Sequence, residues 1–454
     1  MQKESVSITE GSLWKGIFVF SIPLAASNIL QVLFNMSDVA VVGRFAGDAA
    51  LGSVGSTTIL VALFTGLILG AGSGTNVLVA RYLGAKDDRT VRQTVNAALV
   101  VCLAFGLAVL LIGGFFAEGI LILLDTKADL IDGAALYLKI YVLGMPALGL
   151  YNFGSGVLSA AGDTKHPLIY LFSAGIVNVL LNLFFVIVFR MGGAGVAIAS
   201  VISQYLSAFL VLFHLARVDA VYAFRLRGFS LSAAHLWQVL AIGIPSGLQN
   251  AIFQIANLFI QRSVNSFDTL TVEGNSAAAN ADALVYDVMA AFYTGCSTYI
   301  GQNYGAGNLK RVKKSYLVSL TYSFGIALLL GLSLVLFGPY FLALFTKNPA
   351  VVEKGMMRLM VMGFSYPFSA FMDCAIAASR GLGKSGVPTA IVILGSCVFR
   401  LVWVYTIFAF FHTILSLYLL YIVSWTITAI AENIYFIHCY RRLAAQDGKK
   451  ENIV

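Results

Sequence analysis

Polar side chains form stripes along two of the apolar segments of this chain. The first stripe, at spacings of three, four and three, comprises Asn28, Gln31, Asn35 and Asp38. The second, at spacings of four, three and four, comprises Asn250, Gln254, Asn257 and Gln261. A helix places residues at such spacings on one face. Aligned amides can hold membrane helices together, but four in line exceed what packing requires, so we expect both stripes to line a polar cavity.

Asp38 is the strongest chemical signal, because an ionised carboxylate inside a membrane span costs roughly 2.5–3.5 kcal/mol and is usually found with a partner or a pathway. Asn178 and Asn182 lie one turn apart on a later segment, and Ser200 follows on the next. A carboxylate with these neutral oxygens could surround a small cation or shield a proton. The alternatives are that Asp38 reaches water at the end of its span and that the amides only join helices.

The second half of the chain carries its own charges within apolar segments. Asp282 and Asp287 are five positions apart and so lie on different faces of a helix, and we favour Asp287 as the one that faces a cavity. Asp373 and Arg400 are candidates for a buried ion pair. Glu432 lies near the end of its segment, where an acid can extend to water.

The composition defines the environment of these residues. Of 454 residues, 59% are apolar and 11% charged, with a mean hydropathy of +0.87, which is far from the composition of a water-soluble domain. The five cysteines show no CxxC spacing, so neither a disulfide framework nor a zinc site is expected. Runs long enough to cross a bilayer are predicted at 15–37, 53–79, 95–116, 134–158, 168–189, 194–214, 237–261, 277–301, 316–343, 355–378, 387–409 and 414–438.

These runs are continuous rather than alternating, so they predict an all-α membrane protein and not a β-barrel. Roughly two thirds of the 29 basic residues fall in the termini and in the connections after even-numbered helices, including the segments around Lys86, Arg225 and Lys313. The positive-inside rule therefore predicts cytoplasmic termini in a multi-pass protein of the plasma membrane. It also accounts for the net charge of +8 without a nucleic-acid partner.

The chain repeats itself. When the sequence is shifted against itself by 222, Pro23 falls on Pro245, and at a shift of 221 Gly162 falls on Gly383. Six helices return the chain to the same side, so the two halves are predicted to have the same orientation: an N-lobe, 1–220, with helices 1–6, and a C-lobe, 221–454, with helices 7–12. A linker at about 216–235 joins them. Parallel repeats of this kind are a transporter architecture with a site near the bilayer midplane.

We expect the transported molecule to contact six polar residues from the stripes and the second-half acids: Gln31, Asn35, Asn257, Gln261, Asp287 and Asp373. A cavity that combines acids, amides and aromatic rings stabilises positive charge, so small organic cations are the expected substrates. The remaining expected partner is membrane lipid, and the protein is expected to act as a monomer.

In its internal repeat and its loops, the chain resembles the multidrug and toxic compound extrusion (MATE) family over nearly its whole length. The motifs that carry the resemblance, in order, are Ile22-Pro23, Asp38 to Gly43, Ala50-Leu51-Gly52-Ser53-Val54-Gly55, Ala80-Arg81-Tyr82-Leu83-Gly84-Ala85, Gln302-Asn303-Tyr304-Gly305-Ala306-Gly307-Asn308 and Arg380-Gly381-Leu382-Gly383-Lys384. Each motif is short, and their order and spacing make the resemblance specific.

The resemblance implies export of cationic, amphipathic compounds in exchange for protons or sodium ions. It also implies that Asp38 is the coupling carboxylate and that Asn178, Asn182 and Ser200 complete its polar cage. Many relatives have a second aspartate where this chain has Asn182, which leaves the ion open. A bound sodium ion at Asp38, Asn178 and Asn182 is possible, and no other cofactor is expected. The single acid favours proton coupling, because one fewer negative charge weakens a bound cation more than a neutralising proton.

Three other functions compete with this one. A flippase for lipid-linked precursors, from the same superfamily, would need a strongly cationic cavity, whereas Arg400 is the one basic residue placed well inside a span. A membrane-embedded enzyme or a channel is the alternative from another class. An enzyme would need clustered ligands or paired acids, and the five histidines are dispersed, at 166, 214, 235, 412 and 438. We therefore expect a transporter and no enzyme.

Overall fold

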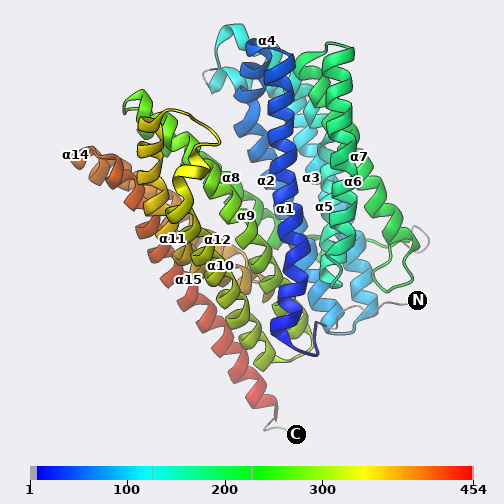
Figure 1. Ribbon diagram of the computed structural model, residues 1–454. Helices are drawn as coiled ribbons and strands as arrows, with labels where there is room; N and C mark the ends of the chain where they lie inside the picture. The colour runs from blue at the N-terminus through cyan, green and yellow to red at the C-terminus, as the bar shows by residue number, and fades with distance from the viewer. Residues whose placement is uncertain (1–7, 125, 226–228, 452–454) are drawn as a thin grey trace. The chain divides into compact units, whose positions relative to one another are not determined.

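The computed structural model describes residues 8–451 except 125 and 226–228, and side chains as far as 446. Residues 226–228, within the predicted linker, thus lie outside the described part. All regular structure in that part is helical, with no strand (Figure 1). The first half contains α1 Leu13–Phe45, α2 Asp48–Gly84, α3 Asp88–Leu123, α4 Ala128–Tyr141, a 3-10 turn Val142–Gly144, α5 Met145–Ala160, α6 Lys165–Leu183, a π-helical segment Phe184–Val188 and α7 Gly192–Arg217.

The second half contains α8 Ala233–Val264, α9 Thr269–Gly305, α10 Leu309–Leu342, α11 Pro349–Gly381, α12 Gly386–Val392, a π-helical segment Ile393–Val398, α13 Phe399–Trp403, a second π-helical segment Val404–Phe408, α14 Ala409–Phe411 and α15 Ile414–Glu451. Counting α4 with α5, and α12 to α14 together, the described residues form the twelve predicted helices. Ten of the twelve predicted runs lie within one of them, and the other two, 168–189 and 316–343, extend one residue past the end of their helix.

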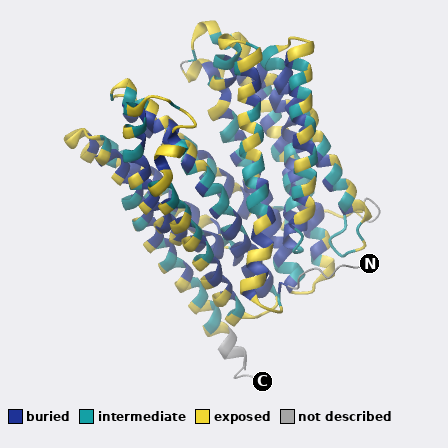
Figure 2. Cartoon of the chain, viewed as in Figure 1, coloured by how far each residue is buried: buried dark blue, intermediate teal, exposed yellow. Residues whose placement is uncertain are grey.

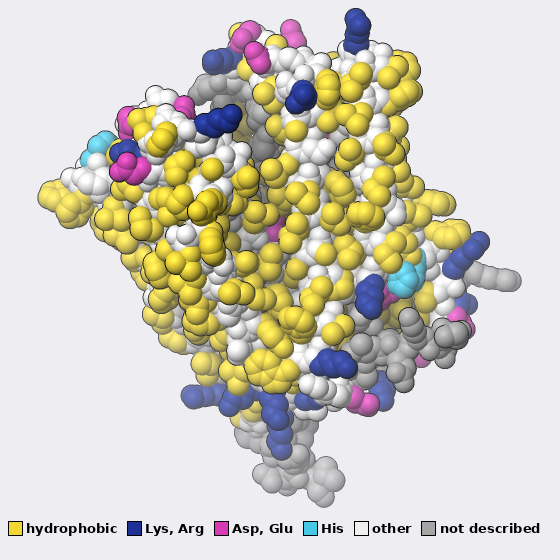
Figure 3. Space-filling model, in the orientation of Figure 1, with side chains coloured by type: hydrophobic (Ala, Val, Ile, Leu, Met, Phe, Trp, Pro, Cys, Tyr) yellow, Lys and Arg dark blue, Asp and Glu magenta, His cyan; other side chains and the backbone are white. Residues whose placement is uncertain are grey.

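Eleven of these described helices are long and apolar enough to cross a membrane. The twelfth is α9, whose apolar character is diluted by Glu273, Asp282 and Asp287. Large apolar side chains lie on the outside of the helices, where Phe115, Leu123 and Phe410 are 80%, 81% and 83% exposed. Hydrophobic side chains cover most of the visible face in Figure 3, as expected for helices whose outer surface contacts lipid. The chain is a multi-pass membrane protein.

Contacts divide the described chain into two compact units. The first comprises the described residues between Ala26 and Ala251, and the second those up to Ala25 and from Ile252 onward. Both divisions fall inside a helix, α1 and α8, a few positions after Pro23 and Pro245. The predicted lobes divide the chain elsewhere, at 220/221, and they stay a prediction about which parts move together.

Each unit has its own core, seen as the dark blue residues within the helices in Figure 2. In the first unit α2 packs against α3 and α5, and α6 against α7; in the second, α9, α10 and α15 pack against α11. Gly106 lets α3 approach α5, because a Cβ there would lie 2.6 Å from the Cα of Pro146 and 2.7 Å from the carbonyl oxygen of Met145.

The repeat extends to backbone detail at the helix ends. Residues in the left-handed region (φ 44° to 91°) form three pairs at shifts of 221, 221 and 222: Lys86 with Gly307, Gly162 with Gly383, and Arg190 with His412. The starts of α3 and α10 match as well. Asp87 accepts the backbone N–H of Thr90 at 3.1 Å, and Asn308, its counterpart at a shift of 221, accepts that of Arg311 at 3.0 Å. The halves therefore share turns and caps as well as helices.

Candidate functional site

A close approach of α1 and α6 positions the first candidate site. A Cβ at Gly175 would lie 1.8 Å from the ring of Phe34, so only glycine leaves room for that ring against α6. One turn further along each helix come Asp38 and Asn178, whose side chains are therefore brought to the same place. Ser200 comes from α7, which packs against α6.

The four predicted cage residues form one hydrogen-bonded cluster. The Nδ2 of Asn182 donates to Oδ1 of Asp38 at 2.5 Å, and the Oγ of Ser200 donates to Oδ2 of Asp38 at 3.1 Å. The amides are linked in turn, because Asn182 donates to Oδ1 of Asn178 at 3.2 Å and Asn178 donates to Ser200 at 3.3 Å. Asp38 is 9% exposed and Asn182 is fully buried. Asp38 therefore does not extend into water.

Neutral groups alone donate to this carboxylate. Among the described residues no Lys, Arg or His lies within ion-pair distance of Asp38. The Oδ1 of Asn182 is buried and has no hydrogen-bond partner among the described residues. A buried carboxylate without a countercharge is costly to ionise, and a free amide oxygen beside it can accept a proton-bearing group or ligate a cation. The cluster can therefore hold either a proton on Asp38 or a bound cation.

Two tyrosines next to this cluster were not predicted. Tyr137 and Tyr141 of α4 are 5% and 9% exposed, and their rings stack with centroids 5.7 Å apart. Their hydroxyls lie near enough to interact electrostatically with the Asp38 carboxylate. The spacing of four identifies a helix face, but sequence alone does not indicate which segment that face meets.

The four amides assigned to substrate binding lie on helix surfaces. Gln31 and Asn35 are exposed side chains of α1 in the first unit. In the second unit Asn257 is exposed and its Oδ1 accepts a long hydrogen bond, 3.4 Å, from Nη1 of Arg400. Gln261 is exposed and donates to Oδ1 of Asn265 at 2.9 Å. Exposure leaves these side chains available for a ligand, and their role stays a prediction.

The acids of α9 have different surroundings. Asp282 is paired with the buried Arg358 and also accepts from the hydroxyl of Tyr366, so its charge is compensated. Asp287 is part-buried. The choice of Asp287 as the α9 acid that faces a cavity stays a prediction. Asp373 of α11 is part-buried, with one carboxylate oxygen, Oδ2, buried and unpaired among the described residues.

Two expectations about second-half charges were wrong. Arg400 makes no ion pair with Asp373 among the described residues; it donates to Ser424 at 3.3 Å and lies over aromatic rings, including that of Tyr421 at 4.8 Å. Opposite charge alone does not make two helix faces meet. Glu432 does not extend to water, because it is fully buried and both of its carboxylate oxygens lack a hydrogen-bond partner among the described residues. It interacts electrostatically with Arg380 and Asp373.

Comparison with known proteins gives the family. The MatE family model matches residues 23–184 and again residues 245–406, which confirms the internal repeat at a shift of 222. The probable multidrug resistance protein YpnP of Bacillus subtilis (strain 168) is 31% identical over 369 residues, 80% of this chain and 82% of its own length. The multidrug export protein MepA of Staphylococcus aureus (strain MRSA252) is 20% identical over 406 residues, 87% of this chain and 89% of its own.

The fold is also that of solved structures. A structure described as MATE in the bent conformation superposes with a TM-score of 0.90 at 21% identity, covering 99% of this chain and all of its own. An outward-facing structure of a multidrug resistance MATE family transporter of the MOP superfamily superposes with a TM-score of 0.90 at 22% identity, covering 98% and 99%. The chain therefore belongs to the MATE family of membrane transporters and is not an enzyme.

Proposed function

We propose that this transporter is a multidrug efflux antiporter that exports small organic cations in exchange for protons, with Asp38 as the coupling carboxylate. The observation that carries the proposal is a buried carboxylate whose hydrogen-bond donors, Asn182 and Ser200, are both neutral. Multidrug resistance and export in the names of its relatives support the class of substrate.

The amide of Asn182 can hydrogen-bond to Asp38 in both protonation states of the carboxyl group. Ionised Asp38 accepts from Nδ2 of Asn182, as in the cluster described above. Protonated Asp38 becomes a donor, and rotation of the amide would present the otherwise unpaired Oδ1 of Asn182 as its acceptor. The two protonation states then select two arrangements of α1 and α6. A proton on Asp38 removes the negative charge that favours a cationic drug, so proton and drug exclude each other.

Sodium is the competing ion. The amide oxygens of Asn178 and Asn182 and the hydroxyl of Ser200 are suitable hard ligands, but Asp38 is the single carboxylate among these four residues. A sodium ion would be held by electrostatic attraction to one negative charge, whereas a proton forms a covalent O–H bond with a single carboxylate oxygen. This asymmetry favours the proton.

The decisive experiment is uptake of an ethidium-like dye into proteoliposomes under separately imposed proton and sodium gradients. We expect the proton gradient alone to drive dye movement. Transport driven by the sodium gradient alone would refute proton coupling, and movement of an anionic lipid precursor with no dye transport would instead identify a flippase.

We further propose that the protein lies in the plasma membrane with both termini cytoplasmic and acts as a monomer. The positive-inside distribution supports the orientation. A single cysteine at the position of Lys313, in a cysteine-free background, should be protected from impermeant reagents in intact cells. Labelling of that position from outside would reverse the topology, and crosslinking to a defined dimer in membranes would overturn the monomer.

A further inference from the structure

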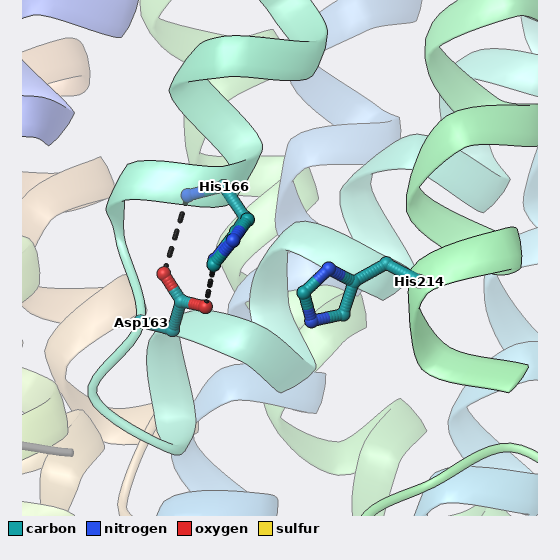
Figure 4. Close-up of side chains that lie close together, drawn as sticks. All are labelled: Asp163, His166 and His214. Atoms are coloured by element: carbon teal, nitrogen blue, oxygen red, sulfur yellow. Dashed lines mark hydrogen bonds and ion pairs between the residues drawn. The ribbon is translucent and has the colours of Figure 1, made fainter. Parts of the chain in front are cut away.

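Three ligand-bearing side chains meet at one end of the first unit, outside the Asp38 cluster. Asp163 lies in the turn after α5, His166 in the first turn of α6, and His214 in the last turn of α7. One ligand atom from each lies within 4.8 Å of the others. Figure 4 shows the His166 ring beside the Asp163 carboxylate and the His214 ring on the other side of His166, and the centroids of the two rings are 4.5 Å apart. Because α6 and α7 are consecutive antiparallel helices, the start of one lies beside the end of the other.

The carboxylate of Asp163 is held in place by the backbone. Its Oδ1 accepts the N–H groups of Lys165 and His166, each at 3.2 Å, while its Oδ2 faces the Nδ1 of the His166 ring. A helix cap needs only the Oδ1 contacts. It does not account for the imidazole on Oδ2, and it does not account for the second imidazole, that of His214, brought in from α7.

A tyrosine orients the second imidazole. The Nδ1 of His214 is hydrogen-bonded to the hydroxyl of Tyr170 at 2.7 Å. If Nδ1–H donates to that hydroxyl, the lone pair on Nε2 is free to bind a metal. A ligating histidine whose other ring nitrogen is fixed by an oxygen is the common arrangement in metal sites.

The helix hairpin does not itself require these residues. The counterparts of the three ligands follow from the repeat. Asp163 and His166 share the shift of 221 of the pair Gly162 and Gly383, and His214 follows the shift of 222 of the pair Arg190 and His412, so the counterparts are Lys384, Val387 and Phe436. The second half thus builds the same turn and the same helix ends without any of the three ligands. The cluster is an addition to the fold of the first half.

We propose that Asp163, His166 and His214 bind a divalent transition-metal ion, with zinc as the best-matched ion. Two imidazoles and a carboxylate are zinc ligands, and water would fill the fourth position. At zinc–ligand distances near 2.0–2.1 Å the ligand atoms of a tetrahedral site stand about 3.4 Å apart, so small side-chain rotations close the site. The metal replaces the proton shared by His166 and Asp163, which is released to solvent.

The ion can reach this site from water, because the side chains of His166 and Asp163 are 47% and 28% exposed. Its binding would join α6, which carries Asn178 and Asn182, to α7, which carries Ser200. A bound metal would therefore fix the two helices that supply the partners of Asp38, and it would slow any transport step in which they move apart.

The test uses the full-length protein in detergent after chelator treatment, titrated with Zn²⁺ by calorimetry and with Co²⁺ by visible absorption. We expect a single saturable Zn²⁺ site, and Co²⁺ bands typical of a low-symmetry nitrogen and oxygen site. His166→Val and His214→Phe, which install the residues of the second half, should abolish both signals. Tyr170→Phe should weaken Zn²⁺ binding roughly 10-fold or more while leaving the site intact.

His438→Ala is the matched control, since His438 of α15 is a histidine outside this cluster. Its Zn²⁺ affinity should equal that of the unaltered protein. Each variant is checked by thermal unfolding, and Zn²⁺ should raise the melting temperature of the unaltered protein and of His438→Ala but not that of folded His214→Phe. Absence of saturable Zn²⁺ binding, or unchanged affinity in folded His214→Phe and Tyr170→Phe, would overturn the proposal.

Discussion

The two halves of the repeat differ at the position where the first half has its buried acid, Asp38. Asn35 and Asn257 are 222 apart, so Asp38 corresponds to Ile260. Pro167 and Pro388 are 221 apart, whereas the left-handed residues Arg190 and His412 are 222 apart. One residue is therefore added in the second half between these landmarks. The π-helical segment Ile393–Val398, which has no counterpart in α6, is where such an insertion is accommodated.

Beyond that segment the shift is 222, and Asn178 corresponds to Arg400. The same place in the fold thus holds a carboxylate and an amide in the first half, and an isoleucine and an arginine in the second. Arg400 is 2% exposed and lies over the rings of Phe253, Tyr421 and Trp425 at 5.6, 4.8 and 5.9 Å. Duplication has kept the backbone and reversed the charge, so we expect ion coupling in the first half alone.

The largest effect should come from Asp38→Asn, which mimics the protonated acid. Gradient-driven efflux should fall to background while the protein folds normally, because the amide keeps the size of the side chain and removes its proton exchange. Proteoliposome uptake and thermal unfolding together measure this. Glu118→Gln, which changes an exposed acid of α3, is the control that should retain proton-driven transport. Normal transport by Asp38→Asn would move the coupling site to the second-half acids, Asp287 and Asp373 first.

Asp282→Asn tests the opposite kind of buried acid, one whose charge is compensated. It should leave Arg358 buried without its countercharge and lower the free energy of unfolding by about 3–5 kcal/mol. Denaturation in detergent should therefore separate the two variants: Asp38→Asn remains stable and inactive, whereas Asp282→Asn is unstable. Equal stability of the two would show that the ion pair contributes little.

Arg400→Met tests whether Arg400, the second-half counterpart of Asn178, takes part in ion coupling. Loss of the contacts with three aromatic rings should reduce stability by about 2 kcal/mol, the value of a desolvated cation–π contact. Proton-driven uptake should persist with the same ion dependence. If the variant folds but loses its response to the proton gradient, the two halves share the coupling and the comparison fails.

Asn182→Asp restores a second carboxylate beside Asp38. The extra negative charge should favour a bound cation over a proton, so sodium-driven dye uptake should appear and proton-driven uptake should weaken. The ratio of the two rates, measured under matched gradients, is the readout. Asn182→Ala serves as the control that removes the amide without adding charge, and sodium dependence in both variants would rule out the second charge as its cause.

The smallest effect concerns the helix caps that the halves share. Hydrogen bonds from Thr90 hold the pKa of Asp87 below its usual value, so this cap contributes stability above the pKa of the unfolded state, near 4, and loses it as pH falls through the folded pKa. Protection of the Thr90 amide against hydrogen exchange, taken relative to the intrinsic rate at each pH, should therefore fall on acidification more than that of Arg311, whose cap is the uncharged Asn308. Asp87→Asn should abolish the difference. An equal response of both amides would contradict this.

Most of the helices were predicted from the apolar runs in the sequence, but the helices are longer than those runs. The run 95–116 became Asp88–Leu123, because polar residues at a helix end continue the backbone hydrogen bonds although they do not register as hydrophobic. The repeat and its turns were also visible in the sequence, since glycine and proline mark backbone conformations that recur in both halves.

The site was predictable where residues share one helix or match a family motif, as Asp38, Asn178 and Asn182 do. It was not predictable where contact depends on which helices meet. Tyr137 reaches the Asp38 cluster through packing of α4, and His166 and His214 looked dispersed because they are distant in the sequence although they are neighbours across a helix hairpin. Treating consecutive helices as antiparallel pairs would have brought those two histidines together.

The π-helical segment Ile393–Val398 also preserves the direction in which the side chains beyond it point. Adding one residue to a regular α-helix turns everything beyond it by about 100° around the axis. A wider turn takes up the extra residue locally, so Arg400 keeps the azimuth that Asn178 has in the first half. Deleting one residue from this segment would therefore restore a regular helix, as in α6, and leave the arginine facing its aromatic ring contacts.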